Sequence, residues 1–295
     1  LFANSHTALF FMFLVIALFA LLMFIGSLVL PESPRWLMLK GRRTDAMRVI
    51  KRTVPTEHEV ESELRDIEQT LHSDHHSSIK AVMHKSFVKV LLIGVLLQMF
   101  QQLVGINVMI YYTPTIFGYV GMKGLLAQMT VPTVNMLFTF PAIYLVEKWG
   151  RKKLLYVGAT IMFIAMLSAG IAFQIIGHEM NPQMLSGTLK AVLLSTFIVY
   201  IFGFAFSWGP VAWLLCSEIF PIKGREIGMT ITTMVNWTFA GLVMRYALSF
   251  IEAFGNASLF YVFGVFCILS IVFVAFFVPE TKGITLEKLE GQLKR

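Results

Sequence analysis

Stretches of about 20 consecutive apolar residues recur along the chain, and each is long enough to cross a lipid bilayer as a helix. The composition agrees with this pattern, since 57% of the residues are hydrophobic and 27 residues are Phe. The sequence therefore predicts an α-helical integral membrane protein. Seven spans are predicted, at about 8–30, 88–118, 126–146, 154–177, 187–217, 228–251 and 258–278.

The basic residues alternate between the two sides of the predicted membrane. Of the 24 Lys and Arg, 20 fall in residues 31–88, 147–153, 217–227 and 279–295. Cytoplasmic loops carry an excess of Lys and Arg, so these segments are predicted to be cytoplasmic. On this topology the chain begins on the outer side of the membrane and its C-terminus is cytoplasmic. The membrane is expected to be the cell membrane, which is the inner membrane if the protein is bacterial. The net charge of +7 thus follows topology and does not indicate a nucleic-acid partner.

The predicted spans are distributed unevenly, because one span precedes a long polar segment and six spans with short loops follow it. The polar segment contains amphipathic runs and a capping-box pair, Thr56 with Glu59, so short surface helices are expected there. Many transporters consist of two six-span halves joined by a long loop, and on that pattern about five further spans are expected upstream. The predicted span, cytoplasmic linker, six-span half and tail are residues 1–30, 31–87, 88–278 and 279–295.

Polar residues are concentrated in the second predicted span, in the stretch "QQLVGINVMIYYTPTIF". At about 100° per residue on a regular helix, Gln101 and Gln102 face away from Asn107. They reach one cavity only if the helix is broken between them, which Gly105 permits. Broken helices inside membranes line cavities, as at transporter substrate sites. The alternative is that the amides hold neighbouring helices together. Gln98, one turn earlier, is expected to matter much less for a ligand.

The residue types in this stretch indicate the chemistry of a ligand. Amides and a Tyr hydroxyl both donate and accept hydrogen bonds, and none of them carries a charge. They suit a neutral ligand rich in hydroxyls, a polyol or a monosaccharide. No nucleophile with a nearby base and no set of metal ligands lies inside a span, so neither an enzyme nor a cofactor is expected. The cluster His72–His76 lies in a polar, Ser-rich tract and is interpreted as a solvated loop.

Six motifs follow one another along the chain: "PESPRWLM", "QQLVGIN" with "YY", "EKWGRKK", "SWGPVAW…SEIFP…GR", "NW" and "PETKG". Together they resemble the sugar porter family of the major facilitator superfamily, from its sixth span to its C-terminus. The resemblance implies an all-α membrane fold: a C-terminal six-helix bundle of two three-span repeats, preceded by one span and a cytoplasmic helical linker. The chain looks closest to bacterial sugar:proton symporters, which implies transport of a hexose or pentose by alternating access with protons. Facilitative glucose transporters are also similar.

The resemblance also implies roles for individual residues. The implied sugar-binding residues are Gln101, Gln102, Asn107, Tyr111, Tyr112, Asn135, Trp213, Asn236 and Trp237. Charged residues at helix ends form salt bridges in that family, and these close the cytoplasmic side and break for inward opening. The implied gating residues are Glu32, Arg35, Glu147, Arg151, Glu218 and Arg225, with Gly209 and Pro210 as a flexible break. Ala240 departs from the family, because many relatives have Asn there.

Other protein classes share some of these features. A seven-span receptor also has an outside N-terminus, but it should not carry its long basic loop after the first span. A sugar sensor that binds without transporting, or a truncated and inactive transporter, would show the same motifs. The proton-carrying Asp and its Arg partner belong to the first half of the symporters, so the sequence leaves coupling open.

Overall fold

The structure is a computed structural model that describes residues 5–52, 54, 56–73, 85–119, 125–177, 186–221 and 224–283. The described residues form helices joined by short turns, with no strand among them. This confirms the predicted all-α class. The chain divides into two compact units, Leu1–Ser77 and Ser78–Arg295.

The described residues of the first unit form one long helix and three shorter ones. They are α1 (Ser5–Val29), α2 (Pro34–Leu39), α3 (Arg43–Ile50) and α4 (Glu57–Ser73). The short helices enclose a small apolar core that includes Leu37, Ile50 and Leu64. An ion pair of 2.9 Å between Arg43 and Glu68 joins α3 to α4. The helices expected between the first and second spans are therefore present.

The Thr56–Glu59 pair predicted before α4 is in contact, and Thr56 caps the helix. The Glu59 N–H donates to the Thr56 hydroxyl oxygen at 3.4 Å, and that hydroxyl donates to the Glu59 carboxylate at 2.6 Å. Such a cap satisfies an N–H that the first turn of a helix leaves free. The chain accordingly enters α4 at Glu57.

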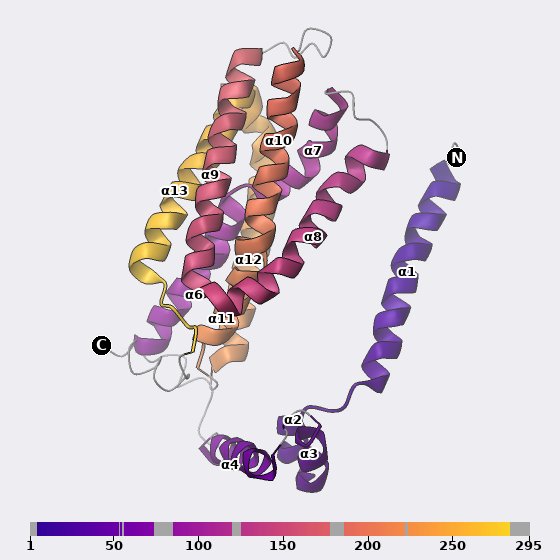
Figure 1. The fold of residues 1–295 in the computed structure, drawn as a ribbon, viewed down its shortest axis with the longest axis vertical. Coiled ribbons are helices and arrows are strands. Elements are labelled where there is room, and N and C mark those ends of the chain that lie inside the picture. The colour runs from indigo at the N-terminus through magenta and orange to yellow at the C-terminus, as the bar shows by residue number, and fades with distance from the viewer. Residues whose placement is uncertain are drawn as a thin grey trace. The chain divides into compact units, whose positions relative to one another are not determined.

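The second unit is a helical bundle (Figure 1). Its elements are α6 (Lys85–Leu103), α7 (Ile106–Tyr119), α8 (Leu125–Trp149), α9 (Arg151–Ile176), α10 (Gly187–Gly203), the π-helical turn η1 (Phe204–Trp208), α11 (Gly209–Ile219), α12 (Arg225–Phe254) and α13 (Asn256–Phe277). Six helical stretches in the described residues are long and apolar enough to cross a membrane, and they match the last six predicted spans. In α1, the first predicted span, the described apolar part is the shorter Ile16–Val29.

The six spans form two sets of three, in which corresponding spans share the same interruption, burial or packing. The first span of each set is interrupted, at Gly105 in one and at η1 in the other. The second span is the least buried, at 17% of its apolar window in α8 and 22% in α12, against 44–50% in the other four. The third spans, α9 and α13, lie side by side (Figure 1). Phe173 and Phe260 join them, with stacked rings whose centroids lie 4.8 Å apart. This correspondence agrees with two three-span repeats.

Helix α9 packs closely against η1 through small residues. A Cβ on Gly158 would lie only 1.7 Å from the Ser207 hydroxyl oxygen and 2.9 Å from the Gly203 carbonyl oxygen. The buried Trp208 donates its Nε1–H to the Leu155 carbonyl at 3.0 Å. Inside a membrane, close approach of small residues and hydrogen bonds between helices stabilise such contacts. The π-helical turn is thereby held at a fixed position against α9.

Candidate functional site

The span formed by α6 and α7 is broken at Val104 and Gly105. Gly105 has a φ of +94°, which a residue with a Cβ rarely adopts, and its N–H donates to the Gln102 carbonyl at 3.0 Å. A Cβ on Gly105 would also lie 2.5 Å from the Phe263 ring. The interruption predicted before Asn107 is therefore confirmed.

Five side-chain amides meet at this break, and we name Gln98, Gln101, Gln102, Asn107 and Asn236 the amide cluster. Asn107 Nδ2 donates to Gln102 Oε1 at 2.6 Å, and Gln102 Nε2 donates to Asn236 Oδ1 at 3.0 Å. Asn236 Nδ2 donates to Gln98 Oε1 at 2.7 Å and to Gln101 Oε1 at 2.5 Å. The break thus turns an amide of α7 toward those of α6, and α12 supplies the fifth.

The amide cluster also reaches the interrupted span on the other side of the bundle. Gln101 Nε2 donates to the carbonyl oxygens of Trp208 at 2.9 Å and Gly209 at 3.2 Å. The Gly209 N–H donates to the Phe204 carbonyl, five residues back, as in a π-turn. Pro210 has no N–H, and its ring would clash with the carbonyl four residues before it in a regular helix, so a wider turn fits here. The two interruptions are therefore joined by one glutamine.

Most of the amide cluster is buried, and its buried polar atoms are hydrogen-bonded. The exposed fractions of Gln98, Gln101, Gln102 and Asn236 are 0%, 3%, 7% and 3%, and Asn107 is half-buried. Among the described residues, every buried side-chain nitrogen and oxygen has a hydrogen-bond partner. Each amide still has donor or acceptor capacity beyond these bonds, so a ligand hydroxyl can bond beside the amide–amide contacts or replace one, and Asn107 offers the most accessible edge.

The other predicted sugar-binding residues lie outside this network. Tyr111 is 67% exposed and Trp237 is 71% exposed. Asn135 is exposed on α8, and Trp213 is half-buried on α11. In the part of the chain that the structure describes, no hydrogen bond joins these side chains to the amide cluster. The side chain of Tyr112 lies outside the described residues.

Two residues of this region were missed by reasoning from the sequence. Gln98, expected to matter little, belongs to the amide cluster through Asn236. The sequence did contain a signal for this, because Gln98 lies three residues before Gln101 and four before Gln102, on the same face of the helix. The second is Tyr200 on α10, whose hydroxyl donates to the Val104 carbonyl at 2.9 Å. A buried Tyr hydroxyl in an apolar span needs a partner, but the sequence does not say which one.

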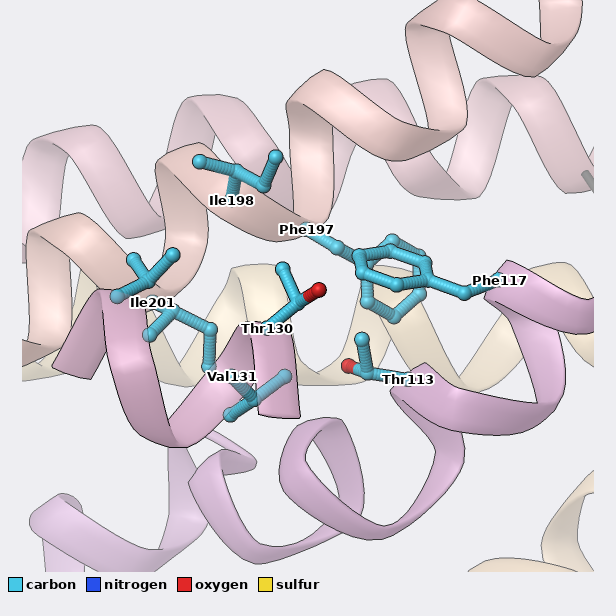
Figure 2. A pocket seen from close by; sticks show the side chains of 8 residues that line it. Thr113, Phe117, Thr130, Val131, Phe197, Ile198 and Ile201 are labelled. Carbon is cyan, nitrogen blue, oxygen red and sulfur yellow. The ribbon is translucent and has the colours of Figure 1, made fainter. Parts of the chain in front are cut away.

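A separate narrow gap, partly open to the outside and without room for a water molecule, lies between α7, α8 and α10. Figure 2 shows the rings of Phe117 and Phe197 beside the hydroxyls of Thr113 and Thr130. The Thr113 hydroxyl already donates to the Met109 carbonyl. The remaining lining is apolar, so a ligand rich in hydroxyls would find few partners here. The amide cluster is the better candidate site.

A second polar cluster joins the ends of α8, α9 and α11, and we name Glu147, Arg151, Glu218, Glu280 and Thr281 the arginine cluster. Arg151 Nη2 donates to Glu218 Oε1 at 2.6 Å and to Glu147 Oε1 at 3.1 Å. The Arg151 and Glu218 side chains are 9% and 25% exposed, whereas Glu147 is 73% exposed. Since water screens exposed pairs, the contact between Arg151 and Glu218 is the stronger one.

Glu280 and Thr281 fasten the segment after α13 to this cluster. The Glu280 carboxylate accepts the N–H groups of Arg151 at 3.0 Å and Lys152 at 3.1 Å, at the start of α9. Helix N-termini favour negative charge and present free N–H groups, so this carboxylate suits the position. The Thr281 hydroxyl donates to Glu218 Oε2 at 2.5 Å. Carboxylates from three segments, the end of α8, the end of α11 and the segment after α13, therefore converge on Arg151.

Two of the remaining predicted gating residues, Arg225 and Glu32, form contacts with other residues. Arg225 donates through Nε and Nη2 to the Phe220 carbonyl, both at 3.3 Å. Glu32 forms an exposed ion pair of 3.1 Å with Arg42 in the first unit. The side chain of Arg35 lies outside the described residues. Gly209 and Pro210 begin α11 directly after the π-turn.

Neither thiols nor metal ligands form a further site in the described part of the chain. Cys216 and Cys267 are buried and free. No group of three or more His, Cys, Asp or Glu that could hold a metal ion occurs among the described residues. The side chains of His72–His76 lie outside them.

Six apolar spans, two of them interrupted around a buried polar cluster, define a multi-pass α-helical membrane protein of the transporter class. The sequence model of the family described as "Sugar (and other) transporter" matches residues 2–293, so the chain belongs to that family. Its members are transporters and not enzymes.

Individual relatives and solved structures agree with this assignment. The chain is 37% identical over 285 residues to the galactose-proton symporter of Escherichia coli K12, which covers 95% of this chain and 60% of the symporter. It is 35% identical to the facilitated trehalose transporter Tret1 of Polypedilum vanderplanki, covering 90% of this chain and 53% of Tret1.

The solved proton:xylose symporter XylE with bound 6-bromo-6-deoxy-D-glucose has a similar fold, with a TM-score of 0.71 and 33% identity. The match covers 93% of this chain and 57% of XylE, which supports the predicted major facilitator fold. The chain thus spans between about half and three-fifths of the length of these relatives.

Proposed function

We propose that the full-length protein carrying this chain transports a monosaccharide, a hexose or a pentose, across a cell membrane by alternating access. We further propose that it does so by symport with protons. The observation that supports this best is the amide cluster, a buried and uncharged set of groups on two spans that also bonds backbone carbonyls of a third.

The chemistry of the amide cluster matches a sugar. Each sugar hydroxyl can donate one hydrogen bond and accept others, and each amide can do both. The amides have donors and lone pairs beyond their bonds to one another, so a sugar hydroxyl can add bonds here, and a typical hydrogen bond contributes a net ~0.5–1.5 kcal/mol. A few such bonds give modest affinity, which allows the sugar to be released on the other side. We propose that Gln101, Gln102, Asn107 and Asn236 bind the hydroxyls.

The exposed predicted residues complete this proposal. Trp213, Tyr111, Tyr112, Asn135 and Trp237 would contact the sugar as walls or as further partners, since aromatic rings cover the apolar C–H faces of a sugar. The exposure of three of them is compatible with surfaces that a ligand or another part of the full-length protein covers.

Proton coupling and the range of sugars are suggested by the relatives. The curated names include galactose-, arabinose- and D-xylose-proton symporters, beside a facilitated trehalose transporter. The distribution of basic residues supports a cytoplasmic C-terminus. The arginine cluster would then lie on the cytoplasmic side, as a latch that opens and closes with the transport cycle.

The experiment is uptake of radiolabelled D-galactose, D-xylose and arabinose into proteoliposomes that contain the full-length protein. Accumulation above the outside concentration when the outside is acidic, abolished by a protonophore, is expected. Equilibration without accumulation would support facilitated transport and overturn the coupling. Binding without uptake would identify a sensor, and neither binding nor uptake of any of these sugars would refute the proposal.

A further inference from the structure

Tyr200 touches the break between α6 and α7 from a different helix. Its side chain is fully buried on α10, and its hydroxyl donates to the Val104 carbonyl at 2.9 Å. In an unbroken helix that carbonyl would accept the N–H four residues further on. The positive φ of Gly105 interrupts the helix at this point. The Val104 carbonyl therefore accepts a hydrogen bond from the Tyr200 hydroxyl in place of a helical N–H.

The position of the break decides where the amides of α7 point. Val104 and Gly105 lie between Gln102 and Asn107, whose side chains meet at 2.6 Å. A small rotation about these two residues would move Asn107 away from Gln102 while leaving both helices intact. The break is held from both sides, because the Phe263 ring covers Gly105 and Tyr200 binds Val104.

We infer that Tyr200 is a positioning residue of the ligand site, which fixes the break so that Asn107 and Gln102 face the same ligand. The inference rests on the proposed function, in which the amide cluster binds a monosaccharide. Tyr200 itself is buried and acts through the Val104 carbonyl.

The first test is the variant Tyr200→Phe in the full-length protein, which keeps the ring and removes the hydroxyl. Loss of one net hydrogen bond from the positioned geometry should weaken binding of whichever labelled sugar binds, D-galactose, D-xylose or arabinose, by about three- to tenfold. Tyr261→Phe is the matched control, because the Tyr261 hydroxyl donates to Gln174 Oε1 at 2.6 Å between α9 and α13. That variant should keep the wild-type affinity.

A second measurement separates positioning from general loss of stability. If Tyr200 acts by placing Asn107, the effect of Tyr200→Phe should largely disappear in an Asn107→Ala background, since coupled residues give non-additive effects. General destabilisation would lower the affinity by the same factor in both backgrounds. Incorporation of 4-aminophenylalanine at position 200, which restores a donor, should recover most of the affinity.

Wild-type affinity of Tyr200→Phe, or equal factors in the two backgrounds, would overturn the inference. Hydrogen exchange of the backbone amides at 105–109 gives a readout that needs no sugar. Exchange should become faster in Tyr200→Phe and stay unchanged in Tyr261→Phe, and unchanged exchange in both would also overturn it. If the wild type binds none of the sugars, the proposed function fails while the exchange result still decides whether Tyr200 fixes the break.

Discussion

Replacing Gln102 by Ala removes the amide that links the two sides of the broken span to α12. Its Oε1 accepts from Asn107 at 2.6 Å, and its Nε2 donates to Asn236 Oδ1 at 3.0 Å. The substitution deletes both bonds and leaves the oxygen of Asn236, a side chain only 3% exposed, without this donor. The variant therefore tests whether the amide cluster binds a ligand or only joins helices.

The size of the effect follows from these two contacts. Each hydrogen bond is worth a net ~0.5–1.5 kcal/mol, and two together give about 1–3 kcal/mol. If the bound sugar forms hydrogen bonds to both Oε1 and Nε2 of Gln102, the substitution should weaken sugar binding by about tenfold or more. A change of ~1.4 kcal/mol corresponds to one decade of affinity.

The assay is equilibrium binding of labelled monosaccharide to the purified full-length protein, with thermal unfolding measured in parallel. Gln174→Ala is the control, because Gln174 is an exposed amide on α9 that bonds only Tyr261 among the described contacts. Its affinity should equal that of the wild type. Gln98→Ala should fall between the two, because Gln98 Oε1 accepts from Asn236 at 2.7 Å.

One result would refute this reasoning. If Gln102→Ala folds, loses thermal stability and still binds the sugar as tightly as the wild type, the amides only hold helices together. The ligand site would then lie elsewhere in the full-length protein.

Two further predictions concern the arginine cluster and the break. Glu218→Gln should increase labelling of cysteines placed on the inward-facing side, because it weakens the main contact of Arg151, whose side chain is only 9% exposed. Glu147→Gln should change this labelling little, since the Glu147 side chain is 73% exposed and water screens its ion pair. Equal labelling in the two variants would contradict a latch role for Glu218. Gly105→Ala should lower the free energy of unfolding by about 2–5 kcal/mol. The reasons are its φ of +94° and the overlap of the new Cβ with the Phe263 ring, and the assay is thermal unfolding. Gly118→Ala, with open space around its Cβ, is the matched control and should be neutral, so equal losses in both would show that the break is not strained.

The local features of this fold follow from its sequence, and the long-range partners do not. Apolar runs mark the spans, and a glycine placed between amides on opposite helix faces predicted the break before Asn107. Helical periodicity gives the face on which a side chain lies, but it does not say which span packs against that face. The bonds from Gln101 to the carbonyl of Trp208 and from Tyr200 to that of Val104 cross about a hundred residues, so they could not be inferred.

The arginine cluster shows the same limit in another form. Glu147 and Arg151 are four residues apart in the sequence, on either side of the turn at Gly150 between α8 and α9, and their ion pair forms. The more buried partner of Arg151 is Glu218, which reaches it from α11. Sequence reasoning named both carboxylates and could not rank them, because rank depends on burial.

The π-turn at Phe204–Trp208 inserts a shift of phase into an otherwise continuous span. A π-turn accommodates one residue more than an α-turn, and one residue corresponds to about 100° of rotation around a helix axis. Tyr200 and Trp213 lie on either side of it, so a helical wheel drawn through both assigns one of them to the wrong face. Removing a single residue within the turn would restore a uniform helix and leave Trp213 and Glu218 facing as they do, whereas winding the turn into an α-helix with no residue removed would rotate both by about that angle. The π-turn therefore determines which way the side chains of α11 face relative to those of α10.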